Sequence, residues 1–152
     1  MLFAPFALRQ LQLANRLVMS PLTRSRAVQD NTANALMATY YAQRAGAGLV
    51  ITEGTSPSPN GLGYARIPGL FNQQHVAGWK LVTDAVHARG GRIVVQLMHT
   101  GRVSHQANLP AGAQVLDLVH LGLCKGTAGS RAGEFQVFGA DLVLGAEDAL
   151  HG

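Results

Sequence analysis

Three short apolar runs along the chain each end in a polar segment. They cover about Arg16–Ser20, Gly48–Thr52 and Arg92–Leu97. An almost unbroken apolar run of this length is typical of a strand that is buried on both faces of a parallel sheet. We therefore predict three strands, each of which delivers polar side chains at its carboxyl end.

A helix is predicted between the first two strands, over about Ala33–Arg44. Thr32 is the expected N-cap, and Gly46 and Gly48 supply a stop signal. Side chains four residues apart lie on the same face of a helix. The expected pair is Leu36 with Tyr40, and Met37 and Tyr41 lie beside it.

A second helix is predicted between the last two strands, over about Gln73–Arg89. Asn72 is its expected N-cap, and Gly90 is expected at the C′ position. Its apolar positions recur with helical spacing and predict one buried stripe, made of Val76, Trp79, Val82 and Val86.

The order strand, helix, strand, helix, strand predicts right-handed parallel βαβ units and an α/β fold. A short hairpin is expected before them, with Leu2–Leu8 and Leu11–Leu13 on either side of Arg9 and Gln10. Past residue 116 the pattern changes, because glycines interrupt any helical period. Glu134–Phe138 and Asp141–Leu144 are candidates for short strands there.

Composition places the chain among globular proteins. It has 152 residues, 47% of them hydrophobic and 13% charged. No apolar stretch approaches the ~20 residues of a membrane-spanning helix, and Met1–Pro5 lacks the basic start and apolar core of a signal peptide. A lone cysteine, Cys124, excludes an internal disulfide framework and favours a reducing cytoplasm.

The positive charge does not predict a nucleic-acid partner. The formal net charge is +4 and the pI is about 9.8. Nucleic-acid binding surfaces concentrate Lys and Arg on one face or along one element. Here the basic residues are scattered singly, with no cluster and no interleaved aromatic stripe. We therefore expect neither DNA nor RNA binding.

Chemistry is expected at the carboxyl ends of the strands, where a β/α barrel builds its active site. Considered by itself, Thr23 is most simply interpreted as a hydroxyl at the end of a strand or in a turn. Tyr64 by itself is most simply interpreted as an aromatic side chain that packs within a loop. Glu53 is a possible general base, although a solvated or Arg-paired carboxylate is the simpler interpretation. Gln96 is more unusual, because a buried amide needs hydrogen-bond partners.

Two other kinds of site are not expected. His99 and His105 have a spacing that fits no common zinc pattern, and Cys124 is distant from both. A glycine-rich stretch at residues 122–130 lacks the Gly-Lys-Ser/Thr ending and the preceding strand of a phosphate-binding loop. We predict no metal site.

Four segments together resemble the old yellow enzyme family, the FMN-dependent ene-reductases. They follow in the right order and at the right spacing: Asn15–Arg24, Tyr40–Ala45, Glu53–Thr55 and Gln96–His105. The resemblance covers about residues 2–116. It implies the N-terminal portion of a TIM (β/α)8 barrel at residues 1–116, with the barrel incomplete, followed by a divergent tail at residues 117–152.

The resemblance also implies roles for individual residues. Pro21, Leu22 and Thr23 would lie at the flavin, with the Thr23 hydroxyl reaching the ring carbonyl beside the hydride-carrying nitrogen and so tuning the flavin. Gly54 would be small to avoid the cofactor, and Gln96 would bind the pyrimidine edge. Two further positions concern the substrate pocket: Tyr64 would line it, and Met98 replaces a Trp seen in several relatives. His99 matches the pattern without an assigned role.

The implied reaction is the NAD(P)H-dependent reduction of an activated alkene through FMN. In the family, the groups that grip the substrate carbonyl, donate the proton and bind the FMN phosphate come later than the matching segments. We therefore expect this chain alone to bind FMN weakly and to turn over little. The alternatives are a non-catalytic half-barrel that acts as a binding or assembly module, and another β/α-barrel enzyme. The oligomeric state stays open.

Overall fold

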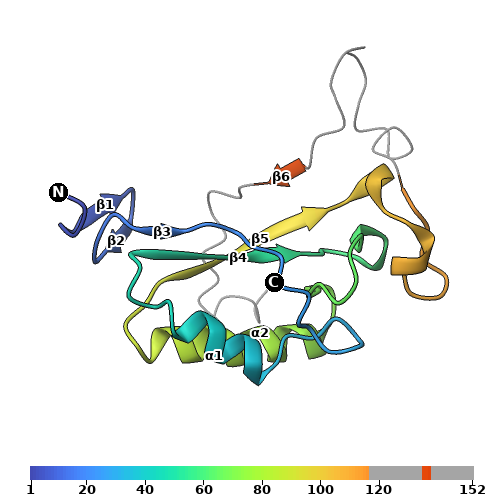
Figure 1. Ribbon diagram of the computed structural model, residues 1–152, viewed down its shortest axis with the longest axis horizontal. Coiled ribbons are helices and arrows are strands. Elements are labelled where there is room, and N and C mark those ends of the chain that lie inside the picture. Colours follow the sequence, from blue (N-terminus) through green and yellow to red (C-terminus); the bar gives the residue numbers. More distant parts are fainter. Residues whose placement is uncertain (117–134, 138–152) are drawn as a thin grey trace, which may run out of the picture.

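The computed structural model describes residues 1–116 and the strand at residues 135–137 (Figure 1). The helices are α1 (Ala35–Ala42) and α2 (Gln73–His87), and short 3-10 turns cover Pro59–Gly61, Gly101–Val103 and Gln106–Asn108. The strands are β1 (Phe6–Leu8), β2 (Leu11–Leu13), β3 (Val18–Met19), β4 (Leu49–Thr55), β5 (Ile93–His99) and β6 (Phe135–Val137).

The predicted βαβ order is confirmed. β3, β4 and β5 form a parallel sheet in that order, with Val18 opposite Leu49 and Val50 opposite Ile93. β1 and β2 form the predicted antiparallel hairpin. β6 falls within the candidate strand Glu134–Phe138 and pairs antiparallel with β5, whereas the candidate at 141–144 lies outside the described residues.

Both helices pack on one face of the sheet, as Figure 1 shows. The core between them contains Met37 and Tyr41 of α1, Trp79 and Val82 of α2, and Val50 of β4. Such apolar burial stabilises a fold by about 25 cal/mol per Å². The opposite face of the sheet has no helix among the described residues, and Val18 on that face is 52% exposed.

Two predicted helix faces need correction. Leu36 is 61% exposed, and the neighbouring pair Met37 and Tyr41 is buried instead. Val76 is 40% exposed, although the other three members of its predicted stripe are buried. In α1 and α2 the buried stripe is flanked by the exposed side chains of Leu36 and Val76.

The helix ends follow capping chemistry. α1 begins after Asn34, whose side chain accepts hydrogen bonds from the N–H groups of Leu36 and Met37, so the predicted cap at Thr32 is wrong by two residues. α2 begins after Asn72, as predicted. Gly90 has a φ of +74°, the left-handed conformation expected of a glycine after a helix, but it lies two positions beyond the C-cap Ala88, so the predicted C′ position is wrong by one residue.

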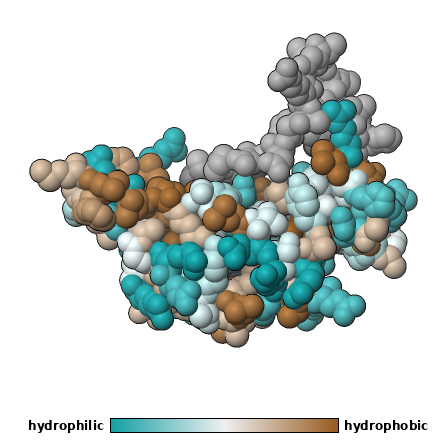
Figure 2. Space-filling view, viewed as in Figure 1, coloured by the Kyte–Doolittle hydropathy of each residue, from teal (hydrophilic) through white to brown (hydrophobic). Residues whose placement is uncertain are grey.

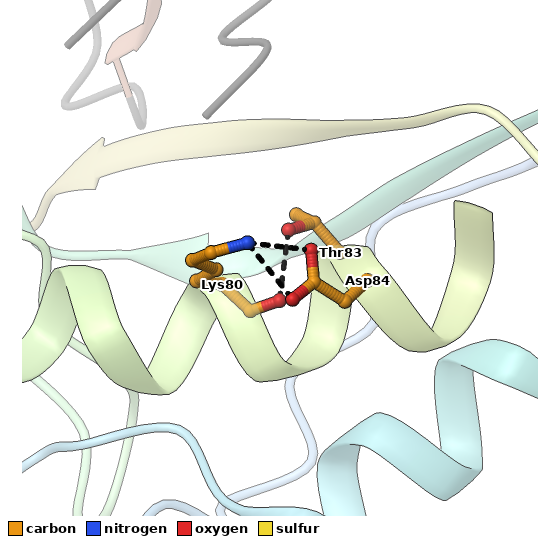
Figure 3. A network of polar contacts seen from close by, with 3 residues as sticks. All are labelled: Lys80, Thr83 and Asp84. Carbon is orange, nitrogen blue, oxygen red and sulfur yellow. Dashed lines mark hydrogen bonds and ion pairs between the residues drawn. The ribbon is translucent and has the colours of Figure 1, made fainter. Parts of the chain in front are cut away.

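The outer face of α2 carries an ion pair between Lys80 and Asp84, with 2.9 Å between Nζ and the nearer carboxylate oxygen (Figure 3). Thr83 donates its hydroxyl hydrogen bond to the Lys80 carbonyl in the same turn. Both charged side chains are more than half exposed, and exposed pairs of this kind contribute only a few tenths of a kcal/mol. The ion pair therefore contributes little to the stability of the fold.

The N-terminal hairpin exposes an apolar surface. Figure 2 shows apolar side chains gathered over this end of the molecule. Phe3 is 75% exposed, and Leu2 and Leu8 are each about half exposed. Within the part of the chain that the structure describes, no helix is long and apolar enough to cross a membrane.

Asn15 joins the start of β3 to the start of β4. Its side-chain oxygen accepts hydrogen bonds from the N–H groups of Leu17 and Gly48, and its amide donates to the carbonyl of Gly46. A Cβ built on Gly48 would lie 2.0 Å from the Asn15 carbonyl oxygen, which is backbone and cannot swing away. Only glycine allows this approach.

We expect Gly48→Ala to lower the free energy of unfolding by about 1–3 kcal/mol, the usual cost of overpacking. Gly46→Ala is the matched control, since a Cβ there meets nothing within 4 Å. Urea denaturation followed by circular dichroism measures both. Equal stability of the two variants would contradict the account.

Candidate functional site

A β-bulge in β4 sets the geometry of the strand ends. Ile51 lies opposite Val94 and Gly54 lies opposite Gln96, so two residues of β4 face a single residue of β5. The hydroxyl of Thr52 accepts the hydrogen bond from the Gln96 N–H at 3.0 Å, in place of a ladder carbonyl. The bulge is therefore stabilised by a side chain at the point where the ladder is interrupted.

The bulge turns the side chain of Glu53 toward the helices. Val50 packs in the core beneath them, so strict alternation would place residue 53 on the opposite face. Instead Glu53 is 1% exposed and its Oε1 accepts a hydrogen bond from the Tyr41 hydroxyl at 3.1 Å. That hydroxyl in turn accepts from the Glu53 N–H at 2.8 Å.

Glu53 also reaches the loop that follows β3. Its Oε2 accepts the hydrogen bond from the Arg24 N–H at 3.2 Å. The expectation that Glu53 is solvated or paired with an arginine side chain is therefore wrong. The side chain is buried and its partner in this loop is the Arg24 backbone N–H, and within the described residues no ion pair involves it. One buried carboxylate thus connects β4, α1 and the loop after β3.

Burial dominates the electrostatics of this cluster. Loss of solvent raises the pKa of Glu53 above its ordinary value, although the hydrogen bonds from Arg24 and Tyr41 partly offset the shift. Burial also raises the pKa of Tyr41, and the Glu53 carboxylate adds to that increase. Tyr41 therefore stays protonated and acts as a donor.

The predicted strand-one residues lie beside this anchor. Pro21 is half-buried, and Leu22 and Thr23 are exposed, directly before Arg24. Leu22 is 50% exposed. Thr23 is thus one residue from the amide that Glu53 holds, on the surface at the carboxyl end of β3.

Gly54 and Gln96 are brought together by the sheet, since they face each other across β4 and β5. Gln96 is 8% exposed. A Cβ at Gly54 would meet Sδ and Cε of Met98 at 2.7 Å, so the methionine would have to move before a side chain fits. The Gly54, Gln96 and Met98 positions share one face of the sheet, opposite the helices.

Tyr64 lies in the long loop between β4 and α2 and is 40% exposed. Side chains of the loop after β5 donate hydrogen bonds to the carbonyls of the three residues that precede Tyr64. The donors are Thr100 to Gly61 at 3.1 Å, Ser104 to Leu62 at 2.7 Å, and Asn108 to Gly63 at 2.9 Å. Tyr64 therefore follows directly after a clamped segment.

His99 has a local role at the end of β5. Its Nδ1 accepts a hydrogen bond from the Gly101 N–H at 3.1 Å, and partial burial lowers its pKa. It therefore stays neutral and shapes the turn. Across residues 1–116 and 135–137, no group of three His, Cys, Asp or Glu side chains is placed to hold a metal ion.

The Glu53–Tyr41 pair was missed by sequence reasoning. The sequence pattern only places Tyr41 beside the expected Leu36–Tyr40 pair, and the predicted second strand stops at Thr52, one residue before the carboxylate. A signal was present, because a glutamate directly after a continuous apolar run needs a buried partner if the strand continues.

The fold and the strand ends together define a segment of a β/α-barrel protein whose polar edge lies at the carboxyl ends of β3, β4 and β5. Residues 1–122 match the model of the NADH:flavin oxidoreductase / NADH oxidase family, and the chain belongs to that family. This confirms the resemblance to the old yellow enzymes drawn from the four motifs.

Two curated relatives illustrate the likeness. The chain is 48% identical to 12-oxophytodienoate reductase 7 of Oryza sativa subsp. japonica, over 74% of this chain and 28% of that protein. It is 45% identical to a chanoclavine-I aldehyde reductase of Penicillium roqueforti, over 76% of this chain and 30% of that protein. The chain therefore spans less than a third of the length of these relatives.

Solved structures agree. Morphinone reductase in complex with tetrahydroNAD superposes with a TM-score of 0.71 at 51% identity, covering 75% of this chain and 31% of that chain. The old yellow enzyme homologue from Zymomonas mobilis has a TM-score of 0.66 at 46% identity, covering 68% of this chain and 29% of that chain. The described residues thus have the fold of the N-terminal portion of a TIM barrel.

We expect Tyr41→Phe to lower the free energy of unfolding by about 1–3 kcal/mol, because it leaves the buried Glu53 N–H without its acceptor. Tyr40→Phe is the control. Its hydroxyl accepts a long, exposed hydrogen bond of 3.5 Å from Arg24, and its ring contacts to Arg24 and Arg44 survive the change. Chemical denaturation of both variants tests the difference, and a larger loss for Tyr40→Phe would refute it.

The raised pKa of Glu53 predicts a specific pH dependence. Between the usual pKa of a glutamate, about 4.3, and the higher folded value, the folded state binds more protons than the unfolded state. The free energy of unfolding therefore falls as pH rises through that window. Relative to Glu53→Gln, the wild type should lose stability from about pH 4 upward, as urea titrations at several pH values would show. A constant difference, or one of opposite slope, argues against the shift.

Proposed function

We propose that this chain supplies the ring-edge portion of an FMN site in an oxidoreductase of the old yellow enzyme type, which reduces activated alkenes with NAD(P)H. One observation carries the proposal. The bulge places Gly54 opposite Gln96, and Glu53 in the same strand holds the amide next to Thr23. Three strand ends that are distant in sequence are thereby joined at one edge.

The chemistry of these residues fits a flavin. Neighbouring strands lie about 4.8 Å apart, so three strand ends can line the pyrimidine edge of one isoalloxazine ring. The Gln96 amide offers a donor and an acceptor. Within the described residues, neither this amide nor the Thr23 hydroxyl has a hydrogen-bond partner, which leaves both for a ligand.

Each residue has a proposed task. Pro21 and Leu22 supply apolar contact near the ring, and the Thr23 hydroxyl donates to the ring carbonyl. A donor there stabilises negative charge on the ring and tunes the flavin. Gln96 binds the pyrimidine edge beside Gly54, and Tyr64 lines the substrate pocket.

Bound FMN would supply the redox chemistry, accepting hydride from a nicotinamide nucleotide and passing it to an alkene conjugated to a carbonyl or nitro group. The likeness to morphinone reductase in complex with tetrahydroNAD supports a nicotinamide donor; NADH and NADPH are both consistent with it. The two relatives are named as reductases of two different small molecules, 12-oxophytodienoate and chanoclavine-I aldehyde. We place the reaction in the cytoplasm, on the basis of the single cysteine.

Loss of one flavin contact should weaken FMN binding about 3- to 10-fold, the equivalent of one net hydrogen bond. We expect this result for Thr23→Ala and for Gln96→Ala in titrations that follow flavin fluorescence. Lys80→Ala, on the outer face of α2, is the control and should leave the affinity unchanged.

Unchanged FMN affinity in both site variants would contradict the proposed site and favour another β/α-barrel protein. Retained FMN without bleaching on anaerobic addition of NADH or NADPH would instead favour a non-catalytic binding module.

A further inference from the structure

Glu53 makes no contact with the flavin in the proposed site. Residues 1–116 contain three acidic residues, and of these only Glu53 is buried. Burying a carboxylate costs free energy unless hydrogen bonds compensate for the lost water. Here the two carboxylate oxygens have separate partners, Tyr41 and Arg24.

The contact to the Arg24 N–H is the significant one, because side chains supply the other ties of this segment. The Arg24 guanidinium lies against Tyr40, and the Arg26 guanidinium donates to the carbonyls of Arg24 and Ser25. Across Pro21–Ser25, the Arg24 N–H is the sole backbone N–H that the described residues bond to a group outside the segment. The next tie comes at Arg26, whose carbonyl accepts a hydrogen bond from the Asn34 side chain at 2.7 Å, and Ala27 then pairs through its N–H and carbonyl with Arg66.

The backbone of Pro21–Ser25 also contains a strained residue that its surroundings must hold in place. Ser25 has a φ of +53°, in the left-handed region that costs a non-glycine residue about 1 kcal/mol or more. Such a conformation persists only when its surroundings impose it. The Glu53 contact lies at the preceding residue.

We propose that Glu53 is a positioning residue that acts through the Arg24 N–H to fix the Pro21–Thr23 segment against the edge where Gly54 and Gln96 meet. This inference rests on the proposed FMN site, because positioning matters only if Thr23 contacts the ring. Tyr41 supports the arrangement by orienting the carboxylate from α1. Glu53 itself does not touch the flavin.

The test compares Glu53→Gln with Glu53→Met. Both side chains are close to glutamate in length, but glutamine keeps a carbonyl acceptor for the Arg24 N–H, whereas the methionine thioether is only a weak acceptor. Two properties are measured on the full chain: the Arg24 amide signal in a ¹H–¹⁵N NMR spectrum, and the affinity for FMN by fluorescence.

We expect Glu53→Met to shift the Arg24 amide and to weaken FMN binding about tenfold, and Glu53→Gln to stay within about threefold of the wild type. Rescue by the glutamine variant separates positioning by a hydrogen-bond acceptor from a need for the negative charge. An unmoved Arg24 amide in a folded Glu53→Met variant would overturn the inference.

The two proposals fail in different ways. If the Arg24 amide moves and Thr23→Ala weakens FMN binding, but Glu53→Met does not weaken it, the flavin site stands and positioning by Glu53 is refuted. If neither Thr23→Ala nor Gln96→Ala changes FMN affinity, the proposed function fails, and the link from Glu53 to a flavin fails with it.

A titration of the wild type keeps the inference testable should Glu53→Met not fold. The titratable or charged groups that face the carboxylate among the described residues are Tyr41 on α1 and Arg24 and Arg26 on the loop after β3. Glu53 is the one carboxylate of this cluster among the described residues, so an acidic midpoint belongs to it. The Arg24 amide should shift with a midpoint above the usual glutamate value, and an amide that does not respond overturns the contact.

Discussion

The bulge at Thr52 and Glu53 is the constraint on which the candidate site depends. A regular β4 would direct Glu53 away from the helices and place a different residue opposite Gln96. The extra residue turns the carboxylate inward to Tyr41, and Gly54 then faces the same side of the sheet as Gln96. The Thr52 hydroxyl replaces the missing ladder acceptor. Bulges of this kind commonly re-aim side chains beside active sites.

The same residues serve both the fold and the site. Glu53 connects β4 to α1 and to the loop after β3, and the clamp from Thr100 to Asn108 joins the loop after β5 to the loop after β4. Neighbouring loops at the carboxyl ends of the strands are therefore tied to one another. The outer face of α2, by contrast, carries only an exposed ion pair between Lys80 and Asp84.

Much of the architecture could be predicted from periodicity. The three strands, both helices and the cap at Asn72 follow from local patterns, which act within a few residues. The exposure of Val76 could not be, because it depends on where α2 lies on the sheet, whereas Asn34 is a preferred cap residue that local rules could have selected over Thr32. The bulge was also missed, since it depends on the pairing of Thr52 with Gln96, 44 residues later.

Family membership is shown by the match over residues 1–122, whereas the claim that the strand ends hold a flavin is ours. Mapping amide shifts on adding FMN to the ¹⁵N-labelled chain tests that claim most directly. We expect the largest shifts at Thr23, Gly54 and Gln96, with the amides of Lys80 and Asp84 unmoved. Shifts spread over α2, or no shifts at any of the three strand ends, would contradict the account.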